Sequence, residues 1–118
     1  MHRDLKHLNI FASDHSSQPR LKIADFGIAA QKTYKNNGSD ETIGTQMSGT
    51  IAYMAPEVIE SDQCDYKQDI WSLGVILYSL LCGNVPFSGK SREEVRRAIL
   101  KDQLEFKDSK WSKISTEC

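Results

Sequence analysis

The chain has 118 residues and a formal net charge of −1 at pH 7, with 26% charged and 39% hydrophobic residues. This length suits one modest domain or part of one, and the near-neutral charge balance favours neither nucleic acid nor an anionic membrane as a partner. The longest strongly apolar run, Val75 to Cys82, is too short to cross a bilayer, and we expect no signal peptide because charged residues follow Met1 almost at once.

The three cysteines, Cys64, Cys82 and Cys118, are scattered along the chain. Their number is odd and their spacing matches neither a disulfide framework nor a paired zinc site. We therefore expect reduced thiols and a cytoplasmic location.

The N-terminal quarter predicts a loop followed by a β-hairpin. Residues 1–9 are expected to form the loop, and the apolar centre of Asn9 to Ala12 predicts a short strand. After a polar, turn-rich stretch, the alternation in Leu21-Lys22-Ile23 predicts the returning strand. Such a hairpin would bring Asn9 close to Asp25.

The stretch from Gln31 to Met47 is polar, so we expect a flexible loop. Its hydroxyls Thr45, Ser48 and Thr42, in this order of preference, are candidate phosphorylation sites. The alternative is a loop that is merely rich in serine and threonine.

Two short signals predict helices in the middle of the chain. Pro56 suits the first turn of a short helix over Glu57 to Glu60. Asp65 and Gln68 have the spacing of a capping box, which predicts a helix over about 66–82. Apolar residues occupy nearly every side of this second helix, so we expect it to be buried.

Glycine and proline predict the end of that helix and the start of the next. Gly83 suits the C-terminal cap, and Pro86 prevents the helix from resuming. Ser91 and Glu94 form a second capping box before a helix over about 92–102. Its apolar residues lie on one face, which is typical of a surface element.

Three motifs in this order resemble the eukaryotic protein-kinase family: His2-Arg3-Asp4-Leu5-Lys6 with Asn9, Asp25-Phe26-Gly27, and Ala55-Pro56-Glu57. The resemblance covers nearly the whole chain. Lys6 and Gly49-Thr50 resemble the serine/threonine branch. The run from Trp71 to Phe87 is similar to calcium- or calmodulin-dependent kinases.

The resemblance implies ATP- and Mg²⁺-dependent phosphorylation of serine or threonine in protein substrates. Asp4 would accept a hydrogen bond from the substrate hydroxyl, and Lys6 would offset the charge of the transferred phosphate. Asn9 and Asp25 would hold Mg²⁺, which prefers hard oxygen ligands. Thr50 would bond toward Asp4 and Lys6 and shape the substrate site. Residues 31–47 would belong to the activation loop, and a phosphate on Thr45, Ser48 or Thr42 would pair with Arg3.

Four further residues have structural roles in this reading. Phe26 is an apolar anchor whose packing could determine whether the loop that carries Asp25 points into or out of the site. Gly27 permits a sharp turn after the metal ligand. Asp69 would hold the backbone around Arg3, although an acid in the first turn of a helix also complements the helix dipole. Glu57 would pair with an arginine located beyond this chain.

The implied fold is mainly α with a small β-hairpin, an α+β arrangement that forms part of a kinase large lobe. Its parts are a catalytic loop (2–9), a metal loop (25–27), an activation segment (25–57), a central helix (about 66–82) and a following helix (about 92–102). The sequence contains neither the glycine-rich loop nor the strand lysine of the N-terminal lobe, which we take to be absent. We therefore expect the isolated chain to have no appreciable kinase activity.

Two alternatives remain open at this point. The chain could be a catalytically inactive, kinase-like binding module that docks through the helix over about 92–102, or a truncated remnant. Calcium or calmodulin regulation is compatible with the resemblance, but no segment of the chain indicates it. The sequence also departs from the family at His7-Leu8, where Pro-Glu is commoner.

Overall fold

The computed structural model describes residues 1–31, 33–34, 40–41, 49–61, 65–106 and 109–115. Within these residues the helices are α1 (Pro56–Ser61), α2 (Lys67–Cys82) and α3 (Arg92–Lys101). The strands are β1 (Ile10–Ala12), β2 (Leu21–Ile23), β3 (Thr33–Tyr34) and β4 (Asp40–Glu41). Three 3₁₀ turns are η1 (His7–Asn9), η2 (Ile51–Tyr53) and η3 (Trp111–Lys113). The prediction of a mainly helical α+β chain with a β-hairpin is confirmed.

The hairpin of β1 and β2 carries the chain away from residues 1–9 and back to Asp25. The strands are antiparallel, with Ile10 opposite Ile23. The ladder continues past the strands, because the Ala24 N–H donates to the Asn9 carbonyl over 2.9 Å. The predicted strand starts one residue too early, since Asn9 ends the η1 turn instead.

Within the stretch over residues 31–47, the structure describes two short strands that the sequence did not predict. Thr33–Tyr34 of β3 pairs antiparallel with Asp40–Glu41 of β4. Threonine and tyrosine favour extended backbone. Two residues in each strand are too few to produce the alternation by which a strand is recognised in sequence.

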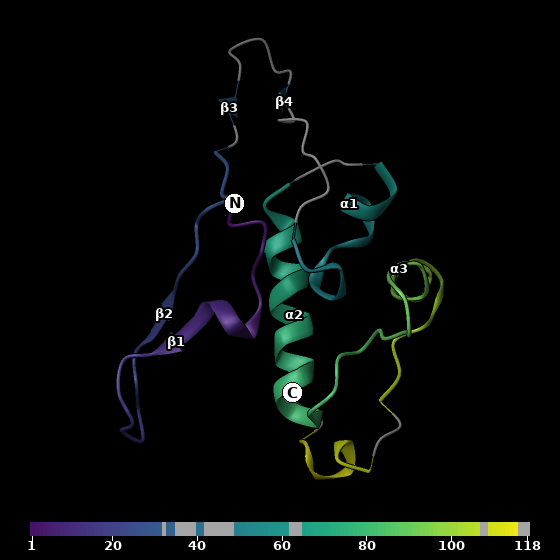
Figure 1. The fold of residues 1–118 in the computed structure, drawn as a ribbon. Helices are drawn as coiled ribbons and strands as arrows, with labels where there is room; N and C mark the ends of the chain where they lie inside the picture. The colour runs from purple at the N-terminus through teal and green to yellow at the C-terminus, as the bar shows by residue number, and fades with distance from the viewer. Residues whose placement is uncertain (32, 35–39, 42–48, 62–64, 107–108, 116–118) are drawn as a thin grey trace.

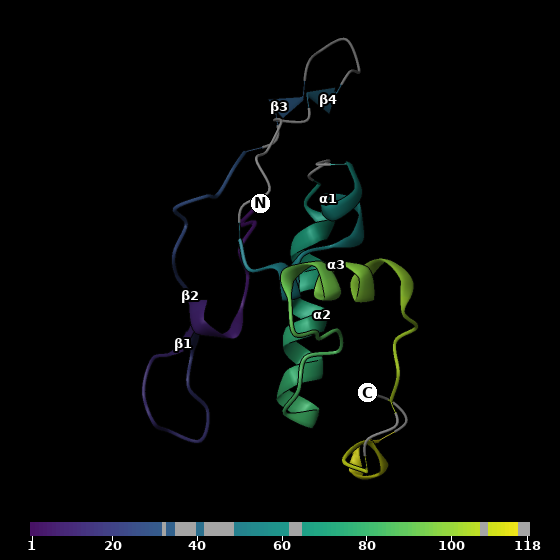
Figure 2. The ribbon, with the colours of Figure 1, turned by 45° about the vertical axis from the view of Figure 1, so that its right-hand side comes forward.

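Helix α2 is the element against which the rest of the described chain is arranged. Figure 1 shows it between the β1–β2 hairpin on one side and α1 with α3 on the other, and in the turned view of Figure 2 the hairpin again lies apart from α1 and α3. It begins one residue after the predicted start, following Tyr66. It ends as predicted at Gly83, whose φ of 80° is left-handed and whose N–H donates to the Ser79 carbonyl over 2.8 Å.

Trp71 of α2 joins three groups of buried apolar residues. The first contains Met54, Ile59, Phe87, Ala98 and Ile99, the second Leu5, Tyr53, Val75 and Ile76, and the third Ala55 and Val58. Trp71 packs against all three. The core therefore runs from α2 outward to η2, α1 and α3.

The prediction that α2 is buried on nearly every side is wrong in the described structure. Ile70, Leu73, Leu77 and Leu80 are all exposed, whereas Val75 and Ile76 are buried. The exposed residues recur at helical spacing, so they form one stripe along the helix. Sequence hydrophobicity indicates which faces can pack but not which of them the described chain covers.

Helix α3 starts with the predicted cap. Ser91 Oγ accepts a hydrogen bond from the Glu94 N–H over 3.2 Å, and the Glu94 carboxylate accepts one from the Lys90 N–H over 2.6 Å. Ala98 and Ile99 face the core, as the pattern predicted. The helix ends at Lys101, one residue before the expected end.

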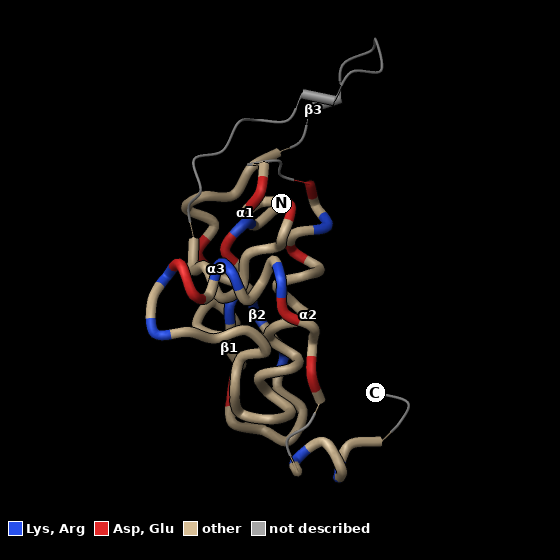
Figure 3. The backbone as a smooth tube through the Cα atoms, turned by 90° about the vertical axis from the view of Figure 1, so that its right-hand side faces the viewer, with Lys and Arg blue, Asp and Glu red and all other residues tan. Residues whose placement is uncertain are grey.

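The charged residues of the described backbone are mixed in sign. Figure 3 shows lysine and arginine interspersed with aspartate and glutamate along the tube, including α3. Among the helices that the structure describes, none is long and apolar enough to pass through a membrane. Cys82, at the end of α2, is buried and carries a free thiol. Cys64 and Cys118 lie outside the described residues.

Candidate active site

Asp4 lies at the centre of a small group of polar contacts. Its Oδ2 accepts a hydrogen bond from Lys6 Nζ over 2.6 Å, and its Oδ1 accepts one from the Thr50 N–H over 3.1 Å. Lys6 Nζ also donates to Thr50 Oγ1 over 3.3 Å. The structure thus brings together three of the predicted site residues from two loops far apart in the sequence.

The surroundings of Asp4 favour its ionised form. Burial raises the pKa of the Asp4 carboxyl, but the hydrogen bonds from Lys6 and Thr50 and the Lys6 charge outweigh burial. The net effect is a pKa below the ordinary value of 3.8. At neutral pH this side chain is therefore a carboxylate that can accept a hydrogen bond.

Asp69 holds the backbone immediately before Asp4. Its Oδ2 accepts a hydrogen bond from the His2 N–H over 2.7 Å, and its Oδ1 accepts one from the Arg3 N–H over 2.9 Å. Arg3 has a φ of 72°, which is uncommon for a residue other than glycine. The carboxylate thus stabilises an unusual backbone conformation from the first turn of α2.

Asn9 and Asp25 lie at neighbouring positions at the end of the hairpin. Asn9 is buried, and its Nδ2 donates to the Asp4 carbonyl over 3.0 Å, which leaves its Oδ1 as an acceptor. The Asp25 carboxylate is exposed, and its Oδ1 accepts a long hydrogen bond of 3.4 Å from the Gly27 N–H. An amide oxygen and a carboxylate are a donor set that fits Mg²⁺.

The remaining predicted residues are spread around this centre. Phe26 is 62% exposed, and its ring centroid lies 4.9 Å from that of His2. Arg3 Nε donates to the Ile28 carbonyl. Glu57 is exposed on α1. Thr42, Thr45 and Ser48 lie outside the described residues.

One contact at this site was not predicted from the sequence. The Tyr53 hydroxyl lies 2.7 Å from His7 Nδ1, and their rings meet edge to face at a centroid distance of 5.8 Å. Tyr53 is buried in η2, whereas His7 is exposed in η1. No local pattern links two polar residues that lie so far apart in the chain.

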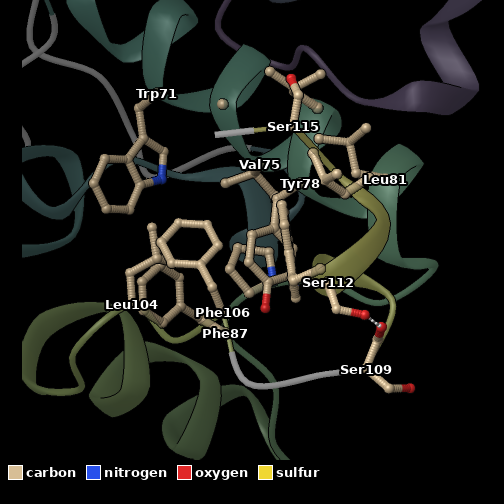
Figure 4. A pocket seen from close by; sticks show the side chains of 15 residues that line it. Trp71, Val75, Tyr78, Leu81, Phe87, Leu104, Phe106, Ser109, Ser112 and Ser115 are labelled. Carbon is tan, nitrogen blue, oxygen red and sulfur yellow. Dashed lines mark hydrogen bonds between the residues drawn. The ribbon is translucent and has the colours of Figure 1, made fainter. Parts of the chain in front are cut away.

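A separate apolar pocket of about 920 Å³ lies between α2 and the C-terminal segment. Figure 4 shows its aromatic walls, which include Trp71, Phe87, Tyr78 and Phe106. None of the predicted site residues lines it. The pocket and the Asp4 centre are therefore distinct features.

The comparisons with known proteins agree with the motifs. The family model of the protein kinase domain matches residues 1–118. The chain is 40% identical to serine/threonine-protein kinase 33 of Bos taurus, over 98% of this chain and 24% of that protein. It is 39% identical to calcium-dependent protein kinase 5 of Plasmodium berghei, over 99% of this chain and 20% of that protein.

A plant protein gives a similar result. Serine/threonine-protein kinase ATG1a of Arabidopsis thaliana is 36% identical over 100% of this chain and 18% of its own length. The chain thus spans between 18% and 24% of these three relatives.

Proposed function

Because the chain belongs to the serine/threonine protein kinase family, we propose that it carries the catalytic loop and substrate site of an ATP-dependent kinase. The proposed reaction transfers the γ-phosphoryl group of ATP to a serine or threonine hydroxyl of a protein. The oxygen of that hydroxyl forms the new bond to the γ-phosphorus. The bond between this phosphorus and the oxygen that bridges it to the β-phosphate breaks and releases ADP, and the hydroxyl proton passes to the Asp4 carboxylate.

The arrangement around Asp4 carries this proposal. Its carboxylate is ionised, and each oxygen accepts a hydrogen bond, Oδ2 from Lys6 Nζ and Oδ1 from the Thr50 N–H. In the proposed role it accepts the hydrogen bond of the attacking hydroxyl and orients it. Lys6, at 2.6 Å from Asp4, is placed to offset negative charge on the transferred group.

We assign Asn9 and Asp25 as the residues that would hold Mg²⁺. Among the described residues, no group of three or more His, Cys, Asp or Glu side chains is placed to hold a metal. Asn9 and Asp25 would therefore bind the ion together with ATP oxygens and water. When bound, Mg²⁺ would neutralise charge on the phosphates.

In the proposed reaction, Thr50 links the segment that would receive the protein substrate to the catalytic loop. Its N–H and Oγ1 both contact the Asp4–Lys6 pair, so the loop that would receive the substrate is joined to the catalytic loop.

Several relatives are calcium-dependent by name. Calcium control of the whole protein is accordingly a property to test by adding calcium to the kinase assay.

A chimera provides the test of this function. Residues 1–118 would replace the matching part of serine/threonine-protein kinase 33, which aligns with 98% of the chain. With ATP and Mg²⁺, the chimera should phosphorylate serine or threonine peptides and not their tyrosine counterparts. Stable, folded chimera without phosphate transfer would favour the binding-module alternative, which need not bind ATP.

A further inference from the structure

We propose that Tyr53 is a positioning residue that holds the catalytic loop through His7. The two side chains meet at 2.7 Å across a separation of 46 residues. This proposal rests on the proposed function, because His7 lies between Lys6 and Asn9, two residues to which that function assigns roles. Neither Tyr53 nor His7 would touch ATP or the substrate in this role.

Tyr53 is a firm anchor because it is held in three further ways. Its side chain is buried in the core group that contains Val75 and Ile76. Its carbonyl accepts a hydrogen bond from Ser72 Oγ of α2 over 2.8 Å. Its N–H donates to the Thr50 carbonyl over 2.9 Å. The hydroxyl is therefore presented to His7 from a fixed position.

His7 is the point at which this anchor reaches the catalytic loop. It is the first residue of η1, and the Asn9 N–H closes that turn on the Lys6 carbonyl over 2.9 Å. Two nearby side chains reach Asp4. Lys6, which precedes His7, contacts the Asp4 carboxylate through Nζ, and Asn9, two residues after His7, contacts the Asp4 carbonyl through Nδ2. A movement of His7 would thus displace Lys6 and Asn9 relative to Asp4.

The phenol can maintain this contact in either direction. It donates its proton when His7 Nδ1 is unprotonated and accepts when Nδ1 carries a proton. Burial raises the pKa of the Tyr53 phenol, although the charge of Lys6 opposes this, so the hydroxyl keeps its proton at neutral pH. Phenylalanine would keep the ring and lose only the polar contact.

Amide hydrogen exchange measured by NMR on the purified chain, without nucleotide, tests the proposal. The reporters are the N–H groups of Asn9 and Ile10, which donate to the Lys6 and His7 carbonyls. Both Tyr53→Phe and His7→Leu should speed their exchange about 3- to 10-fold relative to the α2 amides of Val75 and Ile76. The double variant should exchange no faster than either single variant.

Two further variants distinguish positioning from a general loss of stability. His7→Asn can place an amide group near the position of Nδ1 and should restore slow exchange at Asn9 and Ile10. Tyr78→Phe is the matched control, because it also removes a phenol hydroxyl, one that donates to the Glu105 carbonyl over 2.8 Å in another region. It should leave both reporters unchanged.

The opposite results would overturn the proposal. One such result is that the Asn9 and Ile10 amides exchange equally fast in Tyr53→Phe and in Tyr78→Phe. The other is that they exchange as fast in His7→Asn as in His7→Leu. Because no nucleotide is present, either result rejects the Tyr53–His7 contact as a positioning device and leaves phosphate transfer untouched. An inactive chimera whose reporters exchange slowly would instead reject the proposed function.

Discussion

Gly49 lies directly against Asp4. A Cβ atom at Gly49 would be 3.2 Å from Asp4 Oδ1 and 3.4 Å from the Arg3 carbonyl oxygen. Gly49 also has a φ of 115°, which L side chains rarely adopt. The absence of a side chain is thus what lets the next N–H, that of Thr50, reach the Asp4 carboxylate.

We predict that Gly49→Ala destabilises the chain by about 1–3 kcal/mol, since the added methyl group meets both backbone strain and the carboxylate. Chemical denaturation followed by circular dichroism measures the change. Gly74→Ala is the matched control, because a Cβ there meets no atom within 4 Å. That change should stabilise α2 by about 0.5–1 kcal/mol. Equal effects of the two substitutions would contradict the steric role of Gly49.

Asp69 provides the second prediction. Asp69→Ala removes the acceptor of two N–H groups, those of His2 and Arg3. Leaving partly buried donors without a partner should destabilise the chain by about 2–4 kcal/mol. Asp69→Asn keeps one acceptor oxygen and should lose about half as much. Asp102→Ala, an exposed acid that follows α3, serves as the control and should stay within about 0.5 kcal/mol of wild type in the same denaturation experiment.

Stability at low pH provides the third prediction. The pKa of Asp4 is lower in the folded chain than its ordinary value of 3.8, so the unfolded chain binds the proton more readily. The stabilisation from Asp4 is therefore present above pH 3.8 and is lost as the pH falls through the lower, folded-state value. Urea unfolding between about pH 6 and pH 2.5 should show this fall, and Asp4→Asn should flatten it.

Lys6→Met tests the cause of that shift. Burial raises the pKa of Asp4, and without the Lys6 hydrogen bond and charge less would oppose it, so the pKa of Asp4 should be higher than in wild type. The acid transition should then move to a higher pH than in wild type. An unchanged transition in both Lys6→Met and Asp4→Asn would show that Asp4 does not contribute to it.

Trp71 provides the fourth prediction. It packs against all three groups of buried residues and lies parallel to Phe87, with ring centroids 6.0 Å apart. Trp71→Ala should cost about 3–5 kcal/mol of unfolding free energy, because it leaves a cavity in the core. Trp111→Ala removes the same side chain from a cluster with Tyr78 and Phe106 and should cost less. A larger loss in Trp111→Ala would contradict the central place of Trp71.

The sequence predicted best where a signal is local. The hairpin follows from alternation in two short runs, and the α3 cap follows from Ser91 and Glu94. The C-terminal end of α2 follows from Gly83, but the capping box predicted at Asp65 and Gln68 does not form: no side chain caps the start of α2, and the Gln68 amide donates to Met1 Sδ instead. Each correct prediction depends on residues within about four positions of one another, where backbone hydrogen bonding decides the outcome.

What depends on distant packing was predicted poorly. The exposed stripe on α2, which includes Leu77 and Leu80, could not be told from its buried face by hydrophobicity alone. The Tyr53–His7 contact joins two loops whose approach is determined by the core. The motif residues Asp4, Lys6 and Thr50 do lie together, but the spacing of the motifs contains no information on how Gly49 permits their approach.

Phosphate transfer by the chimera with Asp4→Asn is the most direct measurement. Asp4→Asn removes the proposed acceptor for the substrate hydroxyl and should lower kcat about 10²- to 10⁴-fold. Asp14→Asn, in the exposed turn where its carboxylate contacts Ser13 and Ser16, should leave kcat unchanged. An Asp4→Asn chimera as active as the Asp14→Asn chimera would contradict the assignment of Asp4 as the catalytic residue.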